Sequence, residues 1–102
     1  MTIRVNDATS GSVAMTDSTG FFGATRAIAS TKKAWKNGIQ QGSDFAVAST
    51  GLPTQEAWIC GASAANFGFR QIAAAAWGSS LAGKESGFYN AVLAYMQAVG
   101  AA

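Results

Sequence analysis

Apolar residues recur along most of this chain at steps of three and four positions, the spacing of an amphipathic helix. The clearest segment is 54–81, where Pro53 and Thr54 suit a helix start and Glu56 falls in the first turn. We therefore predict a central helix over about 54–81. Its seam consists of Trp58, Ala62, Ala65, Phe69, Ile72 and Ala76.

The opposite side of this predicted helix is also apolar, because Ile59, Phe67 and Trp77 project from it. A helix that is apolar on every side is buried on every side. A chain of 102 residues with two other helices can hardly surround it. The pattern therefore indicates that copies of the chain, or a partner, complete its cover.

A first helix is predicted over about 18–37, from a cap at Ser18 or Thr19 to the stop signal Asn37-Gly38. Residues 38–53 fit a continued helix, an isolated turn or a short strand. Of these we favour a helix that bends after Gly38. The stripe of the first helix is Phe21, Ala24, Ile28, Thr31 and Trp35.

A third helix is predicted over about 86–100, with Ser86 as its cap. From Gly87 onward the chain has no charged residue, so this end should dock on another surface. Its apolar stripe includes Phe88, Tyr89, Val92, Tyr95 and Val99.

Residues 1–18 are expected to form an extended arm. Ile3 and Val5 alternate with polar residues, which indicates a strand of two or three residues at most, and turn formers follow. In an assembly such an arm could lie across a neighbour. The predicted fold is therefore all-α: one domain over 1–102, a small bundle of two or three helices with an extended N-terminal arm.

Charged residues make up 12% of the chain, about half of the usual share of roughly a quarter. That is little charge for the surface of a small monomer, which favours a self-assembling subunit. The chain has no His, a single Cys, and carboxylates scattered along the sequence. Groups for acid–base, nucleophilic or metal chemistry are therefore missing, and we expect no enzyme, no metal site and no cofactor.

The basic residues suggest two further readings. Arg26, Lys32, Lys33 and Lys36 form the one basic cluster, which is either a solvated helix face or a contact for nucleic-acid phosphates. Arg70 lies in an apolar setting and would need a carboxylate from Asp44, Glu85 or another subunit. A nucleic-acid partner is thus not expected but stays open.

Membrane insertion is not expected either. Residues 57–83 approach the length of a span, but Asn66, Arg70 and Gln71 interrupt them. The N-terminus has no apolar core of a cleavable signal peptide. Export by a leaderless route to the cell surface or beyond is slightly favoured over a cytoplasmic location.

In length and in the spacing of its predicted helical hairpin, the chain resembles in shape the WXG100 family of small secreted helical proteins. The family's Trp-x-Gly turn is not reproduced, because Trp35 and Gly38 are one residue too far apart and Trp77-Gly78 lacks the intervening residue. The acidic residue of its C-terminal secretion signal is absent after Tyr89 and Tyr95. The resemblance implies a hairpin that pairs with a second helical chain.

The favoured function is structural: a subunit that self-assembles into a filament, sheet or shell-like polymer through helix packing. A partner-binding secreted hairpin and a nucleic-acid-coating subunit are the alternatives. The expected assembly interface consists of Trp58, Ala62, Ala65, Phe67, Phe69, Arg70, Ile72, Trp77, Phe88, Tyr89, Val92 and Tyr95.

Overall fold

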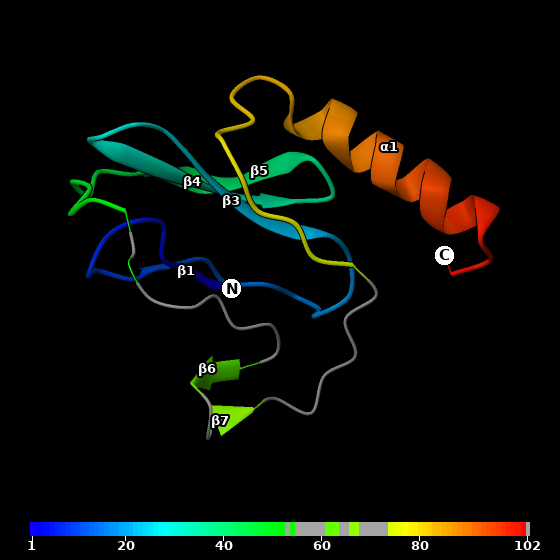
Figure 1. Ribbon diagram of the computed structural model, residues 1–102, viewed down its shortest axis with the longest axis horizontal. Helices are drawn as coiled ribbons and strands as arrows, with labels where there is room; N and C mark the ends of the chain where they lie inside the picture. Colours follow the sequence, from blue (N-terminus) through cyan, green and yellow to red (C-terminus); the bar gives the residue numbers. More distant parts are fainter. Residues whose placement is uncertain (53, 55–60, 64–65, 68–73, 102) are drawn as a thin grey trace.

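The computed structural model describes residues 1–52, 54, 61–63, 66–67 and 74–101. In this part of the chain the structure is mixed α/β (Figure 1). Three strands form the main antiparallel sheet in the order β3-β4-β5, and β1 pairs with β2 in a second sheet. A short pairing of β6 with β7 and one C-terminal helix, α1, follow.

The strands are short and the helix is the longest element. The main sheet consists of β3 (Phe22–Ile28), β4 (Thr31–Lys36) and β5 (Ile39–Phe45). The other elements are β1 (Thr2–Ile3), β2 (Gly11–Ser12), β6 (Gly61–Ser63), β7 (Asn66–Phe67) and α1 (Glu85–Ala98).

The turn between β4 and β5 is made by Asn37 and Gly38, with φ angles of 52° and 77°. Two successive residues with positive φ are typical of the tight hairpin turns that match the twist of antiparallel strands. Asn37 also fixes the start of β3, because its side-chain oxygen accepts a 2.9 Å hydrogen bond from the Phe21 N–H. The dipeptide thus sets the register of β4 and β5 next to the turn, before the register shift between Lys32 and Ala34, and it ties the turn to the start of β3.

The two faces of the main sheet meet different segments. Residues directly opposite each other on neighbouring strands share a face, so Lys32, Ala34 and Phe45 lie on the same face. The N-terminal hairpin, residues 1–13, covers this face: Gly11 packs on the Phe45 ring, and Lys32 bonds to hairpin oxygens. Trp35 lies on the other face, where its indole N–H donates to the Thr25 hydroxyl at 2.7 Å.

Little of the described chain is fully buried. Ile3 and Ala34 are its buried apolar side chains, and Lys32 is its buried charged one. Large apolar side chains stay exposed, including Leu52 at 83% and Trp77 at 71%. The described residues therefore form a thin core for a chain in which half of the residues are apolar.

The all-α prediction is wrong, and so is the helical bundle. The segment 18–37, predicted to be helical, forms β3 and β4, and β5 replaces the helix favoured beyond Gly38. The step pattern failed because the stripe contains only a few large apolar residues, and residues such as Phe, Ile, Thr and Trp fit a pleated strand as well as a helix. Asn37-Gly38 ends a strand here, and not a helix.

The central helix over 54–81 is also contradicted where the chain is described. Gly61–Ser63 and Asn66–Phe67 are strands, and residues 74–81 have no helical turn. Trp58, Ala65, Phe69, Arg70 and Ile72 lie outside the described residues.

The C-terminal helix is confirmed as Glu85–Ala98, close to the predicted 86–100. Ser86 is not its cap, because the N-cap residue is Lys84. The extended arm is corrected as well: its first 13 residues fold back as a hairpin, although the two-residue strand at Ile3 is as short as expected.

Candidate functional site

The hairpin is held on the sheet by a buried charge cluster, which consists of Asp7, Arg26 and Lys32. The Asp7 carboxylate lies 2.6 Å from an Arg26 nitrogen and 2.9 Å from the Lys32 ammonium. The three side chains are 1%, 5% and 0% exposed, respectively. Two cations thus share one anion in a space closed to water, an arrangement that is costly unless every partner is in place.

Backbone oxygens of the hairpin complete the coordination of the two cations. Arg26 donates to the Val5 carbonyl at 2.7 Å, and Lys32 donates to the carbonyls of Ile3 and Thr9. Together with Asp7, every second residue from 3 to 9 therefore offers an oxygen to the sheet. The hairpin wraps the ammonium of Lys32 in oxygens, and no buried polar side-chain atom of the described residues lacks a partner.

Arg26 also connects three segments of the chain. Besides the hairpin, it donates to the Ala29 carbonyl at 2.8 Å, in the turn after β3, and to the Val47 carbonyl at 2.7 Å, beyond β5. A guanidinium suits this role because its planar fork carries five donors in fixed directions. Arg26 is therefore a structural anchor.

The pKa of the Asp7 carboxyl is lowered from 3.8, chiefly because Lys32 donates to its ionised form and Arg26 adds a second charged donor. A second carboxyl, Asp17, has its pKa lowered to about 2 by Lys36, with help from Thr19. The Asp17–Lys36 pair is 2.8 Å long, but the Asp17 side chain is 51% exposed. The two ion pairs thus differ mainly in their access to water and salt.

The structure separates the four basic residues that were expected to share one helix face. Arg26 and Lys32 are buried in the charge cluster, and Lys36 pairs with Asp17. Lys33 lies on the other face of β4, 3.6 Å from Asp44, and stays 40% exposed. This arrangement offers no row of cations to a phosphate backbone, so the geometry does not favour nucleic-acid coating.

Helix α1 docks on the sheet through its first two turns. Phe88 and Tyr89 pack against Phe21, with ring centroids 5.7 Å and 6.3 Å apart. Ser86 donates a 2.9 Å hydrogen bond to the Gly38 carbonyl. The docking site therefore combines the β4–β5 turn with the segment before β3.

The rest of the helix is more open. In Figure 1 its C-terminal half extends beyond the ends of the strands. Tyr95 is 65% exposed and Val99, just after the helix, is 56% exposed. None of the helix residues, all of which belong to the described part of the chain, is fully buried.

Of the predicted interface residues, Phe88, Tyr89 and Val92 are half-buried on the helix, whereas Tyr95 and Trp77 are exposed. Ala62 lies in β6 and Phe67 in β7. The structure therefore gathers the helix residues on one element and places Trp77 in a separate exposed segment. Sequence reasoning missed Asp7 entirely.

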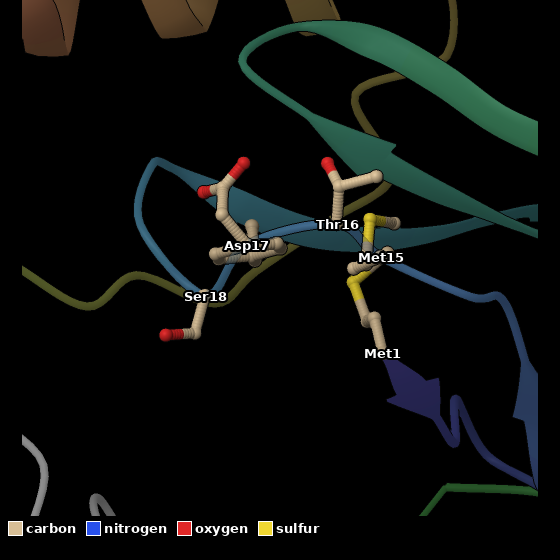
Figure 2. A pocket seen from close by; sticks show the side chains of 6 residues that line it. Met1, Met15, Thr16, Asp17 and Ser18 are labelled. Atoms are coloured by element: carbon tan, nitrogen blue, oxygen red, sulfur yellow. The ribbon is translucent and has the colours of Figure 1, made fainter.

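An open hollow of about 550 Å³ lies between the hairpin, the segment that follows it, and β3 (Figure 2). Three of its lining side chains are apolar and three are polar. The residues that line it are Met1, Met15, Thr16, Asp17, Ser18 and Phe22.

Within the described residues there is no group of His, Cys, Asp and Glu side chains that could hold a metal ion. No helix of that part is both long and apolar enough to cross a membrane. Comparisons with protein-family models, with curated proteins and with solved structures found no match.

Proposed function

We propose that this protein is a structural subunit that assembles with copies of itself through the exposed side of α1. The proposal rests mainly on the C-terminal part of the helix and its cap. Tyr95 in the helix and Val99 just after it are largely exposed, and no charged residue occurs after Glu85. A solvated helix face normally carries charged or strongly polar side chains. The absence of charge over this last stretch suits an interface with another apolar surface.

The thin core of the described residues supports the same proposal. A small domain gains stability mainly from the apolar area that it removes from water. In the described part of the chain few apolar side chains are fully buried, while several large ones stay exposed. Burial between copies would add to the small apolar burial that the described residues obtain within one chain.

The test begins with the purified protein, examined by size-exclusion chromatography with light scattering and by negative-stain electron microscopy. Ordered polymers or discrete rings are the expected result. A chain that stays monomeric at concentrations of about 100 µM, where even weak interfaces with millimolar-to-micromolar Kd begin to fill, would contradict the proposal.

A pair of variants locates the interface. Tyr95→Lys and Val99→Lys place a charge on the exposed apolar side, and a cation near a helix C-terminus does not weaken the helix itself. Each should raise the concentration needed for assembly by roughly tenfold or more, which corresponds to about 1.4 kcal/mol. Ala82→Lys adds the same charge at an exposed turn before the helix and should leave assembly unchanged. Equal assembly of all three would exclude α1 as the interface.

A further inference from the structure

We propose that the N-terminal hairpin is exchanged between copies, so that Asp7 of one chain enters the Arg26–Lys32 pair of the next. The inference rests on the self-assembly proposed above and adds a second contact between the subunits to the one proposed on α1. Exchange of an identical element between protomers needs no new contacts, because each contact already exists within one chain.

The contacts between hairpin and sheet are directional and polar. Lys32 reaches Asp7 and the carbonyls of Ile3 and Thr9, and Arg26 reaches Asp7 and Val5. Removing the carboxylate leaves two buried cations facing each other, which is strongly unfavourable. Each sheet therefore needs one hairpin to pair its two buried cations. Arg26 and Lys32 can bind the hairpin oxygens equally well whether the hairpin belongs to the same chain or to another.

The segment that links the hairpin to β3, residues 14–20, is weakly attached. It has no regular structure, most of its residues are exposed, and Gly20 has a φ of 124°. Its ion pair, from Asp17 to Lys36, includes a carboxylate that is 51% exposed, so water and salt weaken the pair. Seven residues span up to about 25 Å when extended, which is enough to reach an adjacent copy.

The hollow beneath this segment is a second sign of loose attachment. Met15 to Ser18 line the space of about 550 Å³ (Figure 2), and Phe22 of β3 also belongs to its lining. The hollow is open, so on this side the segment is not packed against other described side chains. The position of the hairpin on the sheet is thus fixed by many contacts, whereas residues 14–20, which link it to β3, make few.

Charge reversal tests the exchange. In Asp7→Lys the sheet keeps its two cations, but the hairpin now carries a positive charge. In Lys32→Asp the hairpin keeps its carboxylate, but the sheet now carries a negative charge opposite it. Each variant alone should assemble at least about tenfold less than the wild type, since like charges at a buried contact are costly. Unfolded together and refolded as an equimolar mixture, the two should recover ordered assembly, because only exchange rebuilds the native cluster.

The double variant Asp7→Lys/Lys32→Asp is the control, since it restores opposite charges within one chain. Assembly of the double variant without recovery in the mixture would overturn the exchange and leave the proposed function standing. A monomeric wild-type chain would overturn both.

A second measurement uses only the wild-type chain, so it still tests the exchange if the charge-reversed variants do not fold. Nitrogen-15-labelled and unlabelled chains are refolded together, and a carbodiimide during refolding joins Asp7 to Lys32 as an amide with loss of water. Linked peptides that carry one labelled and one unlabelled half, found by mass spectrometry, support exchange. The exchange is overturned if every linked peptide has both halves labelled or both unlabelled. It is also overturned if a fully assembled sample gives no linked peptide.

Discussion

Asp7 is the single acceptor for two buried cations, and this imbalance makes the members of the cluster unequal. Loss of Lys32 leaves a neutral Asp7–Arg26 pair, whereas loss of Asp7 leaves two cations without a counter-ion. An unpaired buried charge costs far more than the absence of the pair. The stability of the cluster should therefore depend more on its one carboxylate than on either cation.

The corresponding prediction compares Asp7→Asn with Lys32→Met. Lys32→Met keeps most of the side-chain volume and should lower the free energy of unfolding by on the order of 1–3 kcal/mol, because two carbonyls lose their donor. Asp7→Asn should lower it by more. Urea unfolding followed by tryptophan fluorescence measures both, and a smaller loss for Asp7→Asn would contradict the described cluster.

Acid should destabilise the fold through both lowered carboxyl pKa values. A carboxyl whose pKa is lower in the folded state contributes stability above its unfolded value, and this stability is lost as the pH falls through the folded value. For Asp17 the loss occurs between about pH 4 and about pH 2, and for Asp7 it begins below the usual 3.8. Unfolding midpoints across pH 2–6 should fall over this window, and less steeply for Asp17→Asn.

Salt distinguishes the two carboxyls. At about 1 M salt the screening length is about 3 Å, so exposed pairs are weakened while buried ones are not. The stability difference between Asp17→Asn and the wild type should therefore vanish in 1 M NaCl. The difference for Asp7→Asn should persist; its disappearance would mean that water reaches the cluster.

At the scale of elements, the C-terminal helix and the short strand at Ile3 were predicted correctly, and the two longer helices were not. The C-terminal helix could be predicted because the large apolar residues of this long uncharged stretch recur at three- and four-residue steps, which only a helix places on one face. The hairpin of β4 and β5 could also have been found, because Asn37-Gly38 is the strongest short hairpin signal. We read Asn37-Gly38 as a helix stop, since the same dipeptide serves both structures.

The charge cluster could not be predicted in the same way. Asp7 shows only a local signal in the sequence, a turn in which its carboxylate accepts from the Thr9 N–H at 3.0 Å. Its partners lie 19 and 25 residues away on two strands. Only the pairing of β3 with β4 brings them together, and an error in that element hid the cluster.

The docking of the helix on the β4–β5 turn can be tested at two glycines. Gly38 has a φ of 77°, and a Cβ there would lie 2.8 Å from Ser86 Cα. Gly38→Ala should therefore destabilise the fold by about 2 kcal/mol or more, combining the left-handed penalty with the clash. Gly87, in the helix, has nothing within 4 Å of such a Cβ.

Gly87→Ala is the matched control and should stabilise the protein by about 0.5–1 kcal/mol, since alanine favours a helix interior over glycine. Thermal unfolding by circular dichroism measures both. Destabilisation by Gly87→Ala would indicate that this side of the helix is covered, and a neutral Gly38→Ala would contradict the docked arrangement.

At the scale of the whole molecule, stability and assembly should be linked. Association that occurs only between folded chains stabilises them by mass action, so the Tm rises with protein concentration. We expect such a rise over a hundredfold range of concentration for the wild type, and a much smaller one for Tyr95→Lys. A concentration-independent Tm in a protein that still forms polymers would show that unfolding does not require their dissociation.

Because the hairpin buries Lys32, chemical labelling of this lysine reports whether the hairpin has left the sheet. Of the four lysines, Lys32 is the one whose side chain is fully buried, so an amine-directed reagent should modify Lys33 and Lys84 first. Modification of Lys32 requires the hairpin to leave, and the acylated side chain can no longer bind Asp7 as a cation. A brief opening of the hairpin would then permanently remove the charged site on the sheet that binds Asp7. The extent of labelling at Lys32 would measure how often such openings occur.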